Sequence, residues 1–228
     1  PLAITLLFKF LSISFIPKKK DYYESEGKRL SNSLESMGTT FIKLGQFLAT
    51  RPDIIGENLS KQLENLQDKL PPFSLIQAKE IMKNDLGNET YNSIINLSEP
   101  VAAASIAQVH KAQINDNGTI KDVAIKILRP NIKKIFNDEI DAIMLFAFLV
   151  ESFIKKTKRL KLVEVVFLLK EITNLEMDLR FEAAAANEYS ENTKNDVGFR
   201  VPEIYWNFTN ENVMTLDWVD GISIRETE

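Results

Sequence analysis

The stretch VAIKIL, residues 123–128, decides the fold because it places one lysine inside an apolar alternation. Side chains alternate between the two faces of a β-strand, so the three β-branched residues of this stretch are expected on one face. Ala124, Lys126 and Leu128 are expected on the other face. A lysine in such a position calls for an anionic partner, which is a carboxylate, a phosphate or both. The alternative is a lysine on an edge strand that reaches water.

The composition excludes several kinds of site. The 228 residues carry a net charge of −4, which provides no basic field and does not favour a nucleic-acid partner. The absence of cysteine excludes disulfides, thiolate catalysis and cysteine-bound metals. The single histidine, His110, excludes a metal site built from several histidines. The length and the 44% hydrophobic content support one large domain, or one and a half, with a substantial core.

Both ends of the chain indicate a fragment of a longer protein, because it begins with Pro1 and stops at Glu228 in a polar run. Residues 2–16 are almost wholly apolar and are followed by three lysines at 18–20. This segment is shorter than the roughly 20 residues that span a bilayer as a helix, and its charges follow the apolar run, unlike those of a signal peptide. Two interpretations stay open: an interfacial helix whose lysines meet lipid head groups, or a helix that packs on the protein.

Residues 21–95 are expected to form a helical extension. The pattern predicts helices over residues 21–37, 41–51, 54–66 and 75–86. The second of these, FIKLGQFLATR, carries Lys43 and Gln46 on a polar stripe. Gly45 costs this helix roughly 1 kcal/mol relative to alanine, and the common reason for such a glycine is close approach of another backbone. The alternative is a solvated polar stripe with a tolerated glycine.

Residues 96–228 are expected to begin with a β-hairpin. The segment VAAASIAQVHKAQI, residues 101–114, predicts one strand, and residues 115–118 supply turn chemistry before a return strand at 121–128. A run of small residues near the start of the first strand consists of Ala102, Ala103, Ala104 and Ser105. This run is either a turn that approaches a ligand or the close-packed start of a strand. His110 is expected to have a structural role.

Two helical tracts are expected after Arg129 and Pro130 end the return strand. The first contains residues 141–153, which are strongly apolar but too few to span a membrane. We expect a buried helix there, with a lipid-facing patch as the alternative. The basic segment 155–161 is expected to be a solvated linker or, alternatively, an aid to membrane attachment. The second tract covers residues 162–190.

An acidic cluster lies in the second tract. Asp178 and Glu182 are four residues apart and share a face of the predicted helix, whereas Glu176 lies elsewhere around it. Like charges on one helix face are mildly destabilising unless cations neutralise them, and Lys43 and Lys126 are the candidate cations. The alternative is a solvated acidic face.

Two further strands are predicted at residues 203–208 and 212–224, on either side of a turn. Together with the first hairpin and a packed helix, these strands predict an α+β fold. Four strands are assigned from the pattern, and a five-stranded antiparallel sheet is expected. No internal repeat or low-complexity segment interrupts this pattern.

Taken together, these motifs resemble the UbiB family of atypical protein-kinase-like proteins, which are needed for ubiquinone biosynthesis. The family's Lys-x-Gly-Gln motif corresponds to residues 43–46, and its Glu-x-Asp motif to residues 176–178. The alanine-rich loop that replaces a kinase glycine-rich loop corresponds to residues 102–105, and the lysine of the kinase V-A-I-K motif to Lys126. The family's hinge strand resembles VMTLDWVDGISI, residues 213–224. The motifs occur in family order across nearly the whole chain.

The resemblance implies a nucleotide site around Lys126, which would bind the phosphates of ATP or ADP and pair with Glu182. The implied nucleotide-binding residues are Lys126, Ala102, Ala103, Ala104, Ser105 and Ala124. The implied regulatory residues around the pocket are Lys43, Gly45, Gln46, Glu176, Asp178 and Glu182. In this family the Lys-x-Gly-Gln element takes the place of a protein substrate, so it is expected to inhibit protein phosphorylation and favour ATP hydrolysis.

The resemblance also divides the chain. Residues 1–20 would be a membrane-surface segment, residues 21–95 the helical extension, and residues 96–228 a protein-kinase-like N-lobe that ends at the hinge. The family's catalytic Asp loop and its Mg²⁺-binding Asp would follow residue 228, so no catalytic or metal-binding residue is expected within this chain and the C-lobe is expected to be absent. ATP or ADP with Mg²⁺ is the implied cofactor.

For the parent protein, the resemblance implies a kinase-like ATPase that supports the hydroxylation steps of ubiquinone biosynthesis. It would meet isoprenoid quinone intermediates and other biosynthetic enzymes at the cytoplasmic face of a bacterial inner membrane, or at the matrix side of a mitochondrial one. Attachment would be peripheral or through the C-terminus, and a homodimer is left open. One alternative is a non-catalytic lipid-binding or assembly factor, which the apolar segments 2–16 and 141–154 favour. The other is a protein kinase acting in trans.

Overall fold

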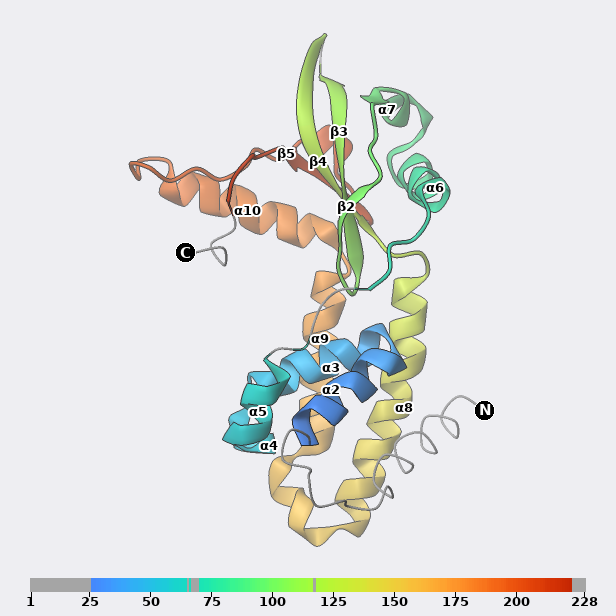
Figure 1. Ribbon diagram of the computed structural model, residues 1–228, viewed down its shortest axis with the longest axis vertical. Helices are drawn as coiled ribbons and strands as arrows, with labels where there is room; N and C mark the ends of the chain where they lie inside the picture. Colours follow the sequence, from blue (N-terminus) through green and yellow to red (C-terminus); the bar gives the residue numbers. More distant parts are fainter. Residues whose placement is uncertain (1–25, 65, 67–69, 117, 223–228) are drawn as a thin grey trace. The chain divides into compact units, whose positions relative to one another are not determined.

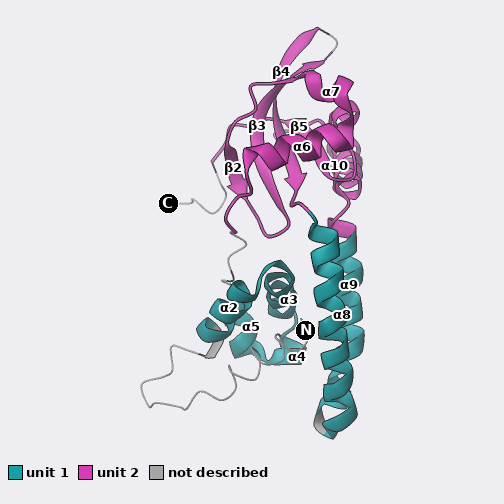
Figure 2. Cartoon of the chain, turned by 90° about the vertical axis from the view of Figure 1, so that its right-hand side faces the viewer, with its two compact units in different colours: residues 1–69, 131–174 teal, residues 70–130, 175–228 magenta. Residues whose placement is uncertain are grey.

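A computed structural model of the chain describes residues 26–64, 66, 70–116 and 118–222. The chain forms two compact units, one of residues 1–69 with 131–174 and the other of residues 70–130 with 175–228 (Figure 2). The apolar segment at 2–16 and the lysines at 18–20 lie outside the described residues. The long helices after Pro130 therefore group with the N-terminal helices rather than with the sheet.

The second unit is built on a five-stranded antiparallel sheet (Figure 1). Its strands are β1 (Ile94–Ile95), β2 (Pro100–Ala103), β3 (Ala107–Asp116), β4 (Thr119–Leu128) and β5 (Val213–Asp217). Both β1 and β2 pair with β3, which pairs with β4, which in turn pairs with β5. Because β4 lies between two strands, Lys126 is not on an edge strand.

The strands differ from the sequence prediction in four places. β1 was not predicted, and β5 ends at Asp217, so residues 218–222 of the predicted strand 212–224 lie outside the sheet. The other two differences are breaks in predicted strands. Residues 101–114 do not form one strand: β2 ends at Ala103 and folds back on β3, with Ala103 opposite Gln108. Residues 203–208 do not form a ladder strand either, because only Ile204 makes an isolated bridge to the sheet before the 3₁₀ turn η2 (Trp206–Phe208). Four strands of the sheet therefore precede the long helices and one follows them.

One face of the sheet forms the core of this unit. Val123, Ile125 and Ile127 are completely buried on it, as the alternation in VAIKIL predicts, and burial of each such side chain contributes about 1.5–3 kcal/mol. They pack with Ala78 and Met82 of helix α6 (Leu75–Leu86). The predicted start of α6 is correct: Ser74 forms a reciprocal capping box with Gln77. A short helix, α7 (Asn88–Asn92), follows α6.

The opposite face of the sheet meets helix α10 (Leu179–Thr193), which contacts β5. The chain enters α10 from α9 (Leu162–Glu176), so the predicted single tract over residues 162–190 is broken. Asp178 causes the break, because it takes an extended conformation and its side chain accepts a hydrogen bond from the Arg180 backbone N–H. This capping position fixes where α10 begins under the sheet.

The first unit is entirely helical in its described part. Its N-terminal helices are α2 (Glu26–Met37), α3 (Thr39–Ala49), α4 (Pro52–Ile55) and α5 (Glu57–Leu63). Its remaining elements are α8 (Ile132–Phe153), the 3₁₀ segment η1 (Lys155–Leu160) and α9. The predicted helix over residues 54–66 is wrong, because Gly56 takes a positive φ of 85° that ends α4 and starts α5. None of the described helices has the length and apolar content needed to cross a membrane.

Candidate functional site

Lys126 is held by a carboxylate of the helix beneath its sheet face. Its Nζ donates to both oxygens of Glu182 on α10, at 2.7 Å from Oε1 and 2.6 Å from Oε2. The side chain of Lys126 is 24% exposed and that of Glu182 is 48% exposed. An ion pair in contact with water to this degree adds at most about 1 kcal/mol to stability. The ion pair therefore adds little to stability, and its partly exposed lysine is placed to bind an anion.

Ala102 of the alanine run lies on the same side of the sheet as Lys126. In the register of the sheet, Ala102 of β2 faces Val109 of β3, which in turn faces Lys126 of β4. Residues that face each other across a ladder project to the same face, and two strand spacings separate Ala102 from Lys126 by roughly 10 Å. Ala124 also projects to this face and is half-buried. This face therefore combines a cation with small side chains that leave room for a ligand.

The turn between β2 and β3 is closed by hydrogen bonds rather than by glycine. The Ala104 N–H donates to the Ala107 carbonyl at 2.8 Å, and Ala103 and Ala104 are half-buried. Ser105 is completely buried at the tip of the turn. Three of the four small residues thus lie within the turn or at its edge, and only Ala102 is exposed. Two interpretations of this run were open, a turn or the close-packed start of a strand. The backbone forms a turn here.

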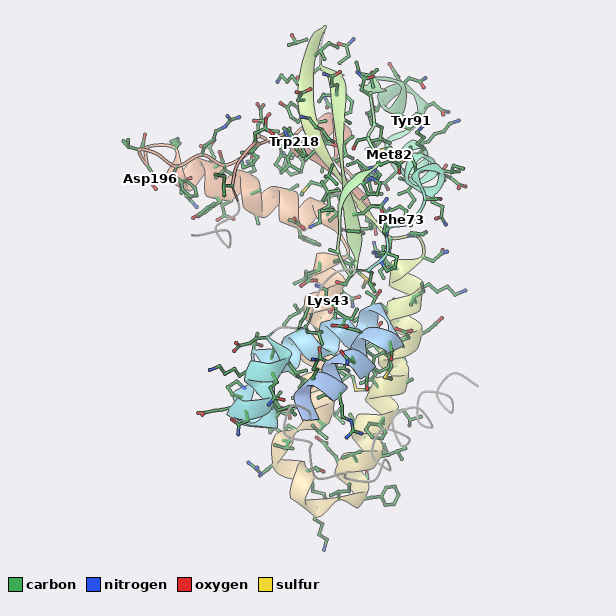
Figure 3. The ribbon with its side chains drawn as sticks, in the orientation of Figure 1. Lys43, Phe73, Met82, Tyr91, Asp196 and Trp218 are labelled. Carbon is green, nitrogen blue, oxygen red and sulfur yellow. The ribbon has the colours of Figure 1, made fainter. Side chains whose placement is uncertain are left out.

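Arg129, which the sequence predicted only to end a strand, holds this turn in place. Its Nε and Nη2 donate to the Ala104 carbonyl at 3.0 and 2.8 Å. Its Nη1 donates to Pro71 O at 2.9 Å, and Nη2 also reaches Leu70 O at 3.4 Å. The guanidinium lies 6.0 Å from the ring centroid of Phe73 (labelled in Figure 3). One planar cation therefore links the alanine turn to the segment that leads into α6.

His110 and Gln108 form a buried polar cluster on the core side of the sheet. The His110 Nδ1–H donates to the Ser98 carbonyl at 2.8 Å, which leaves Nε2 to accept from the Gln108 amide at 2.8 Å. Gln108 also bonds both backbone groups of Phe73, at 3.0 and 3.2 Å. Both nitrogens of the only histidine are occupied, so His110 has the structural role that the sequence suggested.

The titration of His110 predicts how stability depends on pH. Burial lowers the pKa of His110 below its ordinary value of 6.5, against smaller opposing effects of the Ser98 carbonyl and Glu99. Below about pH 6.5 the imidazole of His110 is protonated in the unfolded chain but stays neutral in the folded one. The contribution of neutral His110 to the free energy of unfolding is therefore fully present above about pH 6.5 and declines as the pH falls toward the lowered pKa. We expect urea unfolding at about pH 7.5 and 5.5 to show this loss, and His110→Gln to show less of it. Equal pH dependence in both proteins would contradict the prediction.

The three carboxylates of the predicted acidic face lie in different settings. Asp178 is the N-cap of α10 and forms an ion pair with Arg180 at 2.6 Å, so it does not share a helix face with Glu182. Glu176 is the last residue of α9 and is exposed. The prediction of an Asp178–Glu182 helical pair is wrong because an aspartate at this position caps a new helix instead of continuing the old one.

The Lys-x-Gly-Gln motif belongs to the helical unit. Lys43 and Gln46 are half-buried on α3, where Figure 3 labels Lys43. A Cβ added at Gly45 would lie 2.8 Å from Leu34 Cδ1 and 3.1 Å from Leu66 Cδ2. The glycine therefore makes room for two leucine side chains of its own unit, not for another backbone as predicted. In an alanine variant the Leu34 side chain would have to shift, and overpacking of this kind costs typically 1–3 kcal/mol against a gain of roughly 1 kcal/mol in helix propensity.

The predicted site residues fall into two groups. The sheet unit holds Lys126, Ala124, Ala102 to Ser105, Glu176, Asp178 and Glu182, whereas the helical unit holds Lys43, Gly45 and Gln46. Within the described residues, no three His, Asp or Glu side chains gather in a way that would hold a metal ion. The chemistry available on the sheet face is therefore binding of an anion next to a small-residue turn.

A lysine on an inner strand, a helix glutamate that pairs with it and a short turn over the same face define a protein-kinase-like N-lobe. Residues 65–228 match the ABC1 atypical kinase-like domain, and the chain belongs to this family. The α+β fold with its five-stranded antiparallel sheet agrees with this assignment.

The relatives carry a more particular name. The chain is 34% identical to "Probable protein kinase UbiB" of Marinobacter nauticus and 35% identical to that of Cellvibrio japonicus, over 99% of this chain and 40% of each relative. It is 37% identical to the protein of this name from Vibrio cholerae, over 88% of this chain and 37% of the relative. The resemblance to the UbiB family is thus confirmed, and the chain spans about two fifths of the length of these relatives.

Proposed function

We propose that this chain is the nucleotide-binding N-lobe portion of a UbiB-type kinase-like ATPase that supports ubiquinone biosynthesis, at its hydroxylation steps. The observation that carries the proposal is the bond of Lys126 Nζ to both oxygens of Glu182 on the open face of the sheet. In kinase-like sites, a strand lysine with this partner binds the α- and β-phosphates. The ubiquinone role rests on the name of the relatives.

The residues present fit the phosphates of a nucleotide better than they fit its metal ion. Lys126 supplies the cation, and an ammonium has three N–H donors, of which Glu182 takes two. Ala102, Ala103, Ala104 and Ser105 would cover the nucleotide, with Ala124 on the same face. ATP with Mg²⁺ supplies the phosphoryl group when it is bound. The catalytic Asp and the Mg²⁺ ligands are proposed to come from the rest of the full-length protein.

The helical unit is proposed to regulate this site. Lys43, Gly45 and Gln46 form the element that would exclude a protein substrate and so favour ATP hydrolysis over protein phosphorylation. Glu176 and Asp178 would help to hold the regulatory helices. A membrane surface at the cytoplasmic face of a bacterial inner membrane, or at the matrix side of a mitochondrial one, completes the proposal. There the parent protein would meet quinone intermediates and the enzymes that modify them, as a monomer or a homodimer.

The proposal is tested with the full-length protein. We expect ATP or ADP with Mg²⁺ to raise its unfolding temperature, because the nucleotide binds the folded state alone. We also expect the protein to hydrolyse ATP. We also expect its gene to restore ubiquinone in a strain that lacks its own UbiB-type gene. AMP, which lacks the second phosphate, is the control for phosphate recognition by Lys126. No response to either ATP or ADP would refute nucleotide binding.

A second candidate is a non-catalytic lipid-binding or assembly factor. The observation that favours it is the exposure of large apolar side chains on the long helices, with Phe148 59% and Phe153 81% exposed. The two functions differ in what Lys126→Ala does: an assembly factor would still restore ubiquinone, and an ATPase would not. Transfer of phosphate to a separate protein by the wild-type enzyme would instead favour a kinase acting in trans.

A further inference from the structure

The outward side of α8 changes character halfway along the helix. The inward side stays apolar and buried throughout, from Ile132 to Ala147. Apart from Ile135, the exposed positions of the first half are charged or polar, and they include Lys134, Asp138 and Asp141. The exposed positions of the second half are mainly apolar, namely Leu145, Phe148, Leu149 and Phe153. The predicted buried helix over residues 141–153 is therefore buried on one side only.

Helix α9 exposes further apolar side chains at the same level as this half of α8. Lys170 bonds Asp141 at 3.0 Å, and the Val163 N–H donates to Glu151 at 3.3 Å, so the two helices run antiparallel beside each other (Figure 1). Phe167 lies between Val163 and Lys170 on α9, hence at about the level of residues 145–148 on α8. We call this surface the apolar tip, and its exposed members are Leu145, Phe148, Leu149, Phe153, Ile154, Phe167 and Leu168.

Cations border the apolar tip. The η1 segment that joins the two helices exposes Lys155, Lys158 and Arg159, and Lys161 follows it. Residues 145–170 contain six Lys or Arg and two Glu, a net charge of +4 in a chain whose total is −4. Both glutamates are engaged, since Glu151 accepts from Val163 and Glu164 pairs with Lys161 at 2.9 Å. The local field is therefore positive and selects an anionic partner.

We propose that the apolar tip docks onto an anionic lipid bilayer and lies in its interface without crossing it. Aromatic and aliphatic side chains would enter the boundary between head groups and acyl chains, while the long lysine and arginine side chains stay at the phosphates. Each cation near such a surface strengthens binding about fivefold, and the aromatic side chains add apolar burial. The inference goes beyond the proposed nucleotide site and does not depend on it.

A local probe tests the proposal despite any other membrane contact of the full-length protein. This chain contains no cysteine, so Phe153→Cys can carry an environment-sensitive dye once any cysteine beyond residue 228 is replaced by serine. Vesicles of phosphatidylcholine with phosphatidylglycerol should shift the dye emission to the blue, and lipid-borne quenchers should reduce it. Ile76→Cys, at the 78% exposed Ile76 of the sheet unit, is the matched control and should not respond.

Two pairs of substitutions separate the apolar and electrostatic parts of the proposed contact. We expect Phe148→Ser with Phe167→Ser, and separately Lys158→Glu with Arg159→Glu, each to weaken vesicle binding reported by the Phe153 dye about tenfold or more. The controls are Ile76→Ser with Ile120→Ser, and Lys79→Glu with Lys83→Glu, which alter exposed residues of the sheet unit. Circular dichroism and the unfolding temperature confirm that every variant is folded.

Four outcomes would overturn the inference. The dye at residue 153 stays silent on vesicles, or it responds equally to phosphatidylcholine alone. The tip substitutions leave binding unchanged while deletion of residues 1–20 abolishes it, which would assign the contact to the N-terminal segment. The tip substitutions alter the oligomeric state instead, which would make the surface a protein interface. None of these readouts requires nucleotide, so failure here is distinguishable from failure of the ATPase proposal.

Discussion

Lys126→Ala in the full-length protein is expected to abolish the rise in unfolding temperature that ATP and ADP with Mg²⁺ produce. The substitution removes the cation of the sheet face, and Glu182 is then left as an uncompensated negative charge beside the phosphates. The fold should survive, because the lost ion pair is partly exposed and contributes at most about 1 kcal/mol. The opposite face, where Ile125 and Ile127 are buried, is untouched. Thermal unfolding over a nucleotide titration measures both effects.

The controls for this experiment lie on the same strand and on the partner helix. Lys121→Ala removes another lysine of β4, one that pairs with Asp116 at 3.4 Å, and should leave the nucleotide response unchanged. Glu182→Gln keeps the shape of the partner but removes its charge, so it should weaken the response less than Lys126→Ala. A Lys126→Ala protein that is stabilised by ATP as strongly as the wild type would remove the basis of the proposed site.

The sequence predicted the centre of the sheet well because residues 123–127 of β4 alternate between a buried face and a partly exposed one. A slip of one residue would have placed Lys126 in the core, so the pattern of VAIKIL admits one register. The break between β2 and β3 was missed for a physical reason. No glycine or proline marks residues 104–106, and the turn is made by the Ala104–Ala107 hydrogen bond and by Arg129. Such partners are distant in sequence and leave no local signal.

The part of the candidate site that consists of an ion pair could be predicted from the sequence. The parts that depend on hydrogen bonds to the backbone could not. The residues indicated Lys43 and Lys126 as candidate cations for the acidic cluster, the family resemblance implied Glu182 as the partner of Lys126, and the structure places these two groups 2.6 Å apart. The role of Asp178 was missed because apolar residues keep helical spacing through 162–190, which hides the cap. The available signal was the aspartate itself, because aspartate is a preferred N-cap residue, and its side chain here accepts from the backbone N–H two residues further on. Arg129 left no such signal, because its guanidinium donates to the backbone carbonyls of Ala104, Leu70 and Pro71, and any residue type carries a backbone carbonyl.

Arg129→Ala is expected to loosen the alanine turn and to destabilise the sheet unit by about 2 kcal/mol. The substitution removes every donor to the Ala104 carbonyl from this side chain, and the donors to Leu70 and Pro71. A hydrogen bond from a charged donor contributes roughly 1.5–3 kcal/mol, and the partly exposed carbonyls recover some of this from water, so the low end applies. Hydrogen exchange in the full-length protein measures the effect, with faster exchange of the Ala104 amide as the local sign.

Two further variants test whether the planar guanidinium of Arg129, rather than its charge alone, holds the alanine turn. Arg129→Lys keeps the charge but loses the planar fork that reaches several carbonyls, so its exchange rate should lie between those of alanine and wild type. Arg200→Ala removes a 73% exposed arginine of the same unit and should change the Ala104 amide little. If the turn covers a nucleotide, both Arg129 variants should also bind ATP several-fold more weakly. An unchanged Ala104 amide in Arg129→Ala would show that the turn holds itself, because the Ala104–Ala107 bond would then suffice without the guanidinium.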